Sequence, residues 1–165
     1  MLLTVVLAYL HVVSAIGWLG GGLMFGFVIA PNLAKMAPAS SRDFTLKAVP
    51  GVIRFLQIIA ASTILFGFLL LYNMTNGDFG MLTSSRWGLD LSLGMTTALA
   101  AFVVSEAGAS PAMQRVVELQ RPTPADPNAV PPGVPAASNR ARALAILTAV
   151  LLFVTLAFMV AAGFY

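Results

Sequence analysis

The sequence of 165 residues contains no cysteine, a single histidine and little charge. Without cysteine, the chain cannot form disulfides, thiolate zinc sites or iron–sulfur clusters, and it has no thiol nucleophile. Only 9% of the residues are charged, whereas an ordinary soluble domain carries about 25%. No carboxylate pair, nucleophilic triad or phosphate-binding loop is visible, which disfavours hydrolytic chemistry. The nine basic residues are too few and too scattered to form a nucleic-acid-binding surface.

Apolar residues are what the sequence has in excess, at 59% of the chain. They form four blocks, each long enough to cross a lipid bilayer. We therefore predict an all-α polytopic membrane protein, with a four transmembrane helix bundle as a single membrane domain over residues 1–165. The four helices are expected at residues 2–30, 51–74, 87–109 and 143–165. Pro31 is expected to end the first of them.

Basic residues are distributed unevenly among the connections between these helices. The first and third connections, with the start of helix two, hold eight of the nine: Lys35, Arg42, Lys47, Arg54, Arg115, Arg121, Arg140 and Arg142. The second connection holds only Arg86. Cytoplasmic loops of membrane proteins carry the excess of lysine and arginine. We therefore expect a multi-pass protein of a prokaryotic cytoplasmic membrane, with both termini outside.

The third connection, residues 110–142, is expected to be a cytoplasmic loop rich in proline. Its first dipeptide, Ser110-Pro111, is typical of a helix start, and we predict a short interfacial helix over residues 112–120. The apolar side chains of this helix would face lipid: Met113, Val116 and Val117. Residues 122–135 contain six of the ten prolines, which favours an extended tether. Such a tether either links helices three and four or docks a cytoplasmic partner.

Helix one carries the most specific pattern in the chain. At about 100° per residue, His11, Trp18 and Gly22 fall on one face. Glycines also recur four residues apart, a spacing found in closely packed membrane helices, in the pairs Gly17 with Gly21 and Gly22 with Gly26. Either a neighbouring helix or a flat cofactor can approach such a surface. His11, Trp18 and Gly22 are therefore candidate cofactor-binding residues.

His11 is expected about 14 Å along helix one, inside the hydrocarbon zone. An ionisable group at this depth is costly and points to a functional role. Three roles are open for it: a structural hydrogen bond to Ser14 or to a threonine of another helix, ligation of haem iron or copper, and proton transfer. Met95 and Met159 are expected at similar depths. His11, Met95 and Met159 are thus candidate metal ligands, although methionine also serves as an apolar filler.

Two residues of opposite charge are expected at the cytoplasmic side of the bundle. Arg54 begins helix two, and Glu106 closes helix three at a similar predicted depth. A structural ion pair between Arg54 and Glu106 would lower the cost of placing either charge near lipid. The alternative role for these two residues is an entry route for protons or cations.

The segment LHVVSAIGWLGGGLMFGFVIAP at residues 10–31 contains His11, Trp18, Gly20 and Gly21. With the later PAMQRV stretch at residues 111–116, it resembles the CopD-type copper-resistance membrane proteins and their small relatives. It is similar, more distantly, to the haem-binding helix of HemJ-type protoporphyrinogen oxidases. The resemblance implies a small four-helix membrane bundle with His11 as a haem or metal ligand. The lysine in helix three and the second histidine expected of a HemJ-type enzyme are absent, which disfavours oxidase activity.

Two functions of different classes follow from these observations. The first is that of a small CopD-like protein that binds haem b or copper near the outer leaflet through His11, assisted by Met95 or Met159, for electron transfer or metal handling. The second is that of a non-catalytic scaffold or accessory subunit, which contacts other membrane subunits of a larger complex through its glycine face and its third connection. Neither function requires catalysis, and the sequence favours a protein without enzymatic activity.

Overall fold

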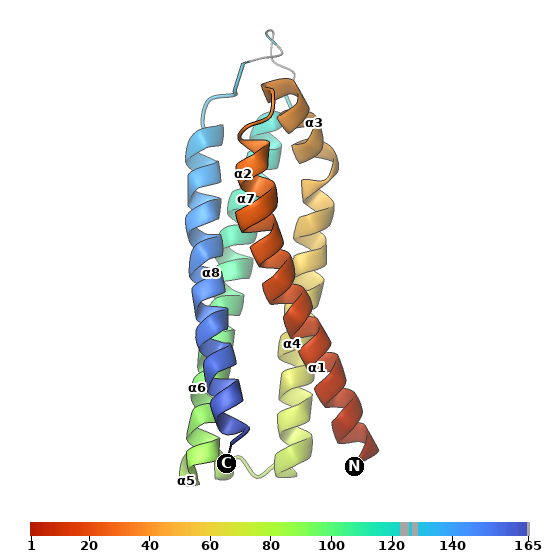
Figure 1. Cartoon of the computed structure of the whole chain (residues 1–165), viewed down its shortest axis with the longest axis vertical. Helices are drawn as coiled ribbons and strands as arrows, with labels where there is room; N and C mark the ends of the chain where they lie inside the picture. The colour runs from red at the N-terminus through yellow and green to blue at the C-terminus, as the bar shows by residue number, and fades with distance from the viewer. Residues whose placement is uncertain (123–125, 127–128, 165) are drawn as a thin grey trace.

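The computed structural model describes residues 1–122, 126 and 129–164, and this part of the chain is all-α. Four of its helical spans are long and apolar enough to cross a membrane. They lie side by side along the long axis of the molecule, and both chain termini lie at the same end (Figure 1). The prediction of a four-helix membrane bundle is therefore confirmed.

The first and third spans are each built from three consecutive elements. The first contains α1 (Leu2–Leu23), the π-helical segment η1 (Met24–Ile29) and α2 (Ala30–Leu33). The third contains α6 (Arg86–Val104), the π-helical segment η2 (Ser105–Ala109) and α7 (Ser110–Gln120). The second and fourth spans are single helices, α4 (Val49–Thr75) and α8 (Val134–Ala162). Two short helices lie in the connections, α3 (Pro38–Lys47) and α5 (Met81–Ser84).

Helix one does not end at Pro31, as the sequence predicts, but continues to Leu33. A proline inside a helix lacks the N–H that its turn needs, and its ring collides with the preceding turn. Here Pro31 lies in the first turn of α2, directly after the π-helical segment η1. The wider turn of η1 provides a local change of register, which is how helices commonly accommodate such an interruption.

The third span is also longer than predicted, and the prediction of a separate interfacial helix over residues 112–120 is wrong. η2 ends at Ala109, two residues before Pro111, and α7 continues the span to Gln120. Val116 and Val117, which we expected to face lipid, are 5% exposed and lie inside the bundle. α8 begins at Val134, so the connection between the third and fourth spans covers only residues 121–133 instead of 110–142.

The four spans pack mainly as two pairs, α1 with α4 and α6 with α8. In the first pair, Gly17 lies against Ile59 and Gly21 lies against Leu56 of α4. A Cβ on Gly17 would be 3.1 Å from Ile59 Cγ2, and one on Gly21 would be 3.0 Å from Leu56 Cδ2. These two glycines therefore serve close helix packing, one of the two roles that their spacing suggests.

The second pair is held by one glycine contact and one hydrogen bond between side chains. A Cβ on Gly94 of α6 would lie 2.9 Å from Met159 Cε of α8. One helical turn further, the hydroxyl oxygens of Thr97 and Thr155 are 2.9 Å apart and share a hydrogen bond. Inside a membrane, small residues and hydroxyl groups of this kind provide the specific contacts that hydrophobic burial alone does not supply.

A buried cluster around Trp18 joins the two pairs. Trp18 is 3% exposed and contacts Phe102 of α6 edge to face, with ring centroids 6.3 Å apart. Ala60 of α4 and Ala101 of α6 are fully buried beside it, and Leu151 and Leu152 of α8 pack against the cluster. We call these residues the Trp18 cluster. All four spans meet there.

The bundle is longer than a bilayer is thick, and the excess lies away from the termini. The third span alone has 35 residues, or about 53 Å, whereas the hydrocarbon core measures about 30 Å. The charge-free parts of α4 and α8 begin only after Arg54 and Arg142. The segments before these residues, with α3 and α7, therefore extend beyond the hydrocarbon at what we call the basic end.

Gly17 and Gly20 of α1 allow a direct test of the packing between α1 and α4. Gly17→Leu should destabilise the bundle by about 1–3 kcal/mol, because the added side chain collides with Ile59. Gly20→Leu is the matched control, since nothing lies within 4 Å of a Cβ at Gly20. Both substitutions gain the same helix propensity, so the difference reports packing alone. Unfolding in detergent, followed by circular dichroism, measures it; equal stability of the two variants would contradict the described packing.

Candidate functional site

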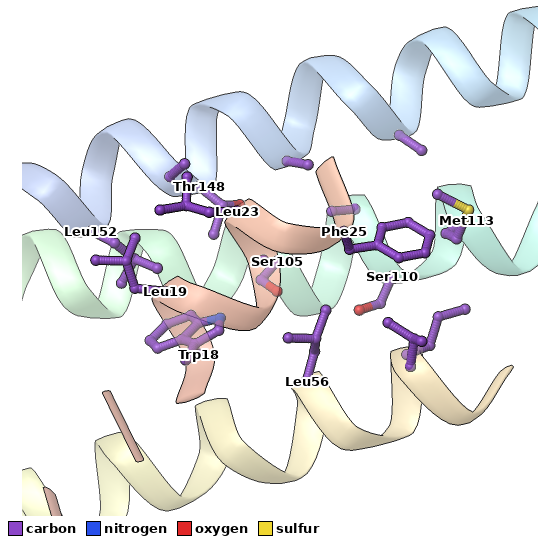
Figure 2. Close-up of a pocket in the computed structure, with 17 residues that line it drawn as sticks. Trp18, Leu19, Leu23, Phe25, Leu56, Ser105, Ser110, Met113, Thr148 and Leu152 are labelled. Carbon is purple, nitrogen blue, oxygen red and sulfur yellow. The ribbon is translucent and has the colours of Figure 1, made fainter. Parts of the chain in front are cut away.

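A small cavity of about 90 Å³ lies among all four spans, next to the Trp18 cluster. Figure 2 shows that Trp18 closes one end of it and that Phe25 and Met113 lie side by side at the other. Its walls are mostly apolar, with three hydroxyl side chains among the lining residues: Ser105, Ser110 and Thr148. The small cavity is thus an apolar space with a few polar groups, the usual composition of a ligand pocket.

A large cavity of about 490 Å³ lies at the basic end, between the ends of the spans and α3. Four residues line both cavities: Phe25, Met113, Ala141 and Ala145. The two cavities therefore adjoin each other, with the ring of Phe25 and the thioether of Met113 at the boundary. Their combined size falls within the range of about 300–1,000 Å³ that is common for small-molecule sites.

Gly22 and Gly26 give the cavities their room on the side of the first span. Gly22 lines the small cavity and Gly26 lines the large one. No heavy atom lies within 4 Å of a Cβ added at either position. The two glycine pairs of the sequence thus have different roles, because Gly17 and Gly21 contact α4 whereas Gly22 and Gly26 face open space. Trp18 and Gly22, two of the predicted cofactor-binding residues, both line the small cavity.

Both π-helical segments border these cavities. Phe25 and Gly26 belong to η1, and Ser105 and Ala109 belong to η2. Isolated π-helical turns inside α-helices occur frequently at functional sites. Sequence reasoning missed them, although each is followed by a proline two residues later. Pro31 and Pro111 were the available signal. Interpreted as changes of helical register instead of helix ends, they would have located the π-helical segments.

Charge at the large cavity is of one sign. Arg42 and Arg142 line it, and no acidic residue lines either cavity in the part of the chain that the structure describes. Arg42 also closes the end of α7, since its Nε donates to the carbonyl oxygen of Gln120 at 2.7 Å and its Nη2 to that of Arg121 at 3.0 Å. Cations near a helix C-terminus stabilise the carbonyl groups left without partners there.

His11 lies in the interface between α1 and α4. Its Nδ1 is 2.9 Å from the carbonyl oxygen of Thr63, and because a carbonyl only accepts, Nδ1 carries the proton. The ring lies over Gly67, where a Cβ would be 2.8 Å from Cε1. The hydrogen bond to another helix was expected, but its acceptor is the backbone of a threonine and not a hydroxyl group. Nε2 is therefore the nitrogen that this hydrogen bond does not use.

The structure does not bring the three predicted metal ligands together. His11 contacts α4, whereas Met159 packs on Gly94 in the other helix pair and Met95 lies half-buried on α6. None of the three lines either of the two cavities. Among the described residues, no group of three or more His, Cys, Asp and Glu side chains is placed to hold a metal ion. Trp18 and Gly22 thus line a cavity that His11 does not line.

The predicted ion pair between Arg54 and Glu106 is not formed. Arg54 is exposed, and Glu106 accepts a long hydrogen bond of 3.4 Å from the Ser105 hydroxyl. Two ion pairs on the bundle surface join residues of the same helix, Lys47 with Asp43 and Arg115 with Glu118. A similar predicted depth does not make two residues face each other, because the rotation of each helix about its axis also has to match.

Comparisons of the chain with protein-family models, with curated proteins and with solved structures found no match. The resemblance of the first helix to CopD-like proteins therefore stays a prediction, and the function has to be argued from the cavities and side chains described above.

Proposed function

We propose that this chain is a non-catalytic membrane protein that binds a single-chain apolar or amphipathic small molecule in its two adjoining cavities. The observation that carries the proposal is the pair Gly22 and Gly26, which line the cavities and have open space where their side chains would be. An interface between helices would fill such positions with neighbouring atoms, as it does at Gly17 and Gly21. The bundle therefore has room for a ligand beside Gly22 and Gly26.

The composition of the walls supports binding without chemical change. Ser105, Ser110 and Thr148 supply hydroxyl groups to the small cavity. Hydroxyl groups act as nucleophiles only when a base activates them. Among the described residues that line the cavities there is no histidine, lysine, aspartate or glutamate. The lining therefore offers contacts and hydrogen bonds but no group suited to proton transfer.

The shape of the combined space favours an elongated molecule. Arg142 lines the large cavity and Leu152 lines the small one. Ten residues of α8 separate them, or about 15 Å along the helix. A dodecyl chain has a similar extended length. A single alkyl chain can therefore reach from the basic end to Trp18.

The two tryptophans of the chain provide a direct binding assay. Trp18 lines the small cavity, whereas Trp87 lies near the start of α6 at the other end of the bundle. In a Trp87→Phe protein, Trp18 is the only indole, and contact with bromine quenches its fluorescence. We expect saturable quenching when amphiphiles with an ω-brominated dodecyl chain are added to the protein in phosphatidylcholine nanodiscs.

Matched glycine variants separate binding in the cavity from quenching by probe dissolved in the bilayer. Gly22→Leu should abolish the saturable part, because its side chain fills the small cavity without a collision. Gly20→Leu adds the same side chain on the same helix but lines neither cavity, so it should leave the quenching unchanged. If no probe quenches Trp18, or if the two variants behave alike, the proposed function fails.

We also infer that the basic end faces the cytoplasm of a prokaryotic cell. The inference rests on the distribution of basic residues: eight of the nine lie at the basic end, four between Lys35 and Arg54 and four between Arg115 and Arg142, whereas only Arg86 lies at the other end. Lysine and arginine near the ends of membrane spans are retained on the cytoplasmic side. Both termini would then lie outside.

Because the chain has no cysteine, single introduced cysteines report this orientation without background. Ser84→Cys lies in α5 and Gln114→Cys on the exposed side of α7, at opposite ends of the bundle. In intact cells, a membrane-impermeant maleimide should label Ser84→Cys, and it should label Gln114→Cys only after the cells are permeabilised. The reverse pattern would overturn the inferred orientation.

A second candidate function is ligation of haem b or copper by His11, as the CopD-like resemblance implies. One observation favours it. Histidines that bind metals commonly donate their other ring N–H to a carbonyl group, which is how His11 Nδ1 uses Thr63. Nε2 is then the nitrogen that would bind an iron or copper ion. Met95 belongs to α6 and Met159 to α8, so a metal ion on Nε2 would reach either thioether only after a movement of the helix pairs.

Spectroscopy and metal analysis of the purified protein test this candidate. A haem protein should show a Soret band that His11→Ala removes, and a copper protein should contain stoichiometric metal that the same variant loses. Met95→Leu and Met159→Leu identify a thioether ligand if one of them also loses the cofactor. Absence of both haem and copper from protein expressed with either one in excess would contradict ligation by His11.

A further inference from the structure

The large cavity presents positive charge to whatever occupies it. Arg142 is exposed at its wall and Arg42 lies half-buried at another, while the described lining residues include no carboxylate. A cationic head group would meet only like charge there. An anionic group would meet two guanidinium groups, which bind carboxylates and phosphates with particular strength because they can donate two parallel hydrogen bonds.

Helix ends add to this positive potential. Pro38 and Ser41, in the first turn of α3, line the large cavity, and so do Val134 and Pro135 at the start of α8. The N-terminus of a helix carries a partial positive charge and favours anions. The opposite effect of the C-terminus of α7 is reduced, because Arg42 already binds the last carbonyl groups of that helix.

A buried side chain without a partner also points to a ligand in this cavity. Gln120, the last residue of α7, lines the large cavity and is 9% exposed. Its Oε1 atom is shielded from solvent and accepts no hydrogen bond from the described residues. Leaving such a group unpaired forfeits the hydrogen bonds that it makes to water, so native proteins rarely do so. Because an amide oxygen only accepts hydrogen bonds, its partner would be a donor, such as the hydroxyl group of a singly protonated phosphate; with the amide group turned over, Nε2 would instead donate to an anionic oxygen.

The position of Arg142 fixes which way an amphiphile would lie. The charge-free part of α8 begins directly after Arg142, so Arg142 marks the boundary between hydrocarbon and head groups. Trp18 and Leu152, at the far end of the small cavity, lie inside the hydrocarbon zone. A head group at Arg142 and an alkyl tail at Trp18 would therefore keep the same orientation as the lipids around the bundle.

We propose that the ligand is an anionic single-chain amphiphile, whose carboxylate or phosphate head group lies between Arg42 and Arg142 beside Gln120, with its tail against Trp18. This rests on the proposed function and adds the chemical class of the molecule. The arginine side chains and the ends of α3 and α8 select the charge of the head group. The narrow space beside Gly22 admits one alkyl chain.

Four probes with the same tail and different head groups test the charge. Two are anions, ω-bromododecanoic acid and ω-bromododecyl phosphate; ω-bromododecanol is neutral and ω-bromododecyltrimethylammonium is the cation. Quenching of Trp18 in the Trp87→Phe protein measures each apparent Kd, after subtraction of the signal from the Gly22→Leu variant. We expect the two anions to bind at least fivefold more tightly than the alcohol, and the cation to bind most weakly. The preferred anion distinguishes a fatty-acid source from a phospholipid source.

Two arginines of α8 provide the matched variants for this test. Arg142→Gln should weaken binding of the anions about fivefold, the effect of one partly exposed charge pair, and leave the alcohol unchanged. Arg140→Gln should change neither, because Arg140 is also exposed but does not line the cavity. If the alcohol or the cation binds as tightly as the anions, this inference is overturned while the proposed function stands. If no probe binds, the proposed function itself has failed.

Discussion

Contact of all four spans at the Trp18 cluster is the constraint on which the rest of the structure depends. Each helix pair is held internally by glycine contacts and hydrogen bonds, at Gly17 in one pair and Gly94 in the other. At this level of the bundle, the two pairs contact each other through the Trp18 side chain, which packs against Phe102 and the buried Ala60 and Ala101. The Trp18 indole therefore packs between the two helix pairs and lines one end of the small cavity.

The division of labour among the glycines follows from rotation about the helix axis. Gly21 and Gly22 are neighbours in sequence, yet one packs on Leu56 and the other faces a cavity, because successive residues point about 100° apart. The same small-xxx-small spacing thus supplies close packing on one side of α1 and open space on the other. A spacing motif alone does not say which side faces a partner.

The four spans were predictable from the sequence because each depends on the mean hydropathy of about twenty residues, which no single side chain changes much. Their ends were not, since Pro31 and Pro111 follow π-helical turns that let the chain remain helical. Trp18 and Gly22, which the sequence places on one face of one helix, both line the small cavity. His11 has its partner on another helix, and an ion pair between Arg54 and Glu106 would also have to join two helices. The rotation of one helix relative to another is not encoded in the local sequence of either.

The cavities exist because crossing helices diverge on both sides of the place where they touch. Toward the termini, α1 and α8 move apart (Figure 1), and lipid chains can fill the space between them within the hydrocarbon zone. Toward the basic end the spans outgrow the bilayer, so lipid no longer fills the gap. There α3 and α7 close it from the sides, with Arg42 joining them through the carbonyl groups of Gln120 and Arg121. Beyond the hydrocarbon, the same divergence of the helices thus leaves a partly open cavity with two arginines in its lining.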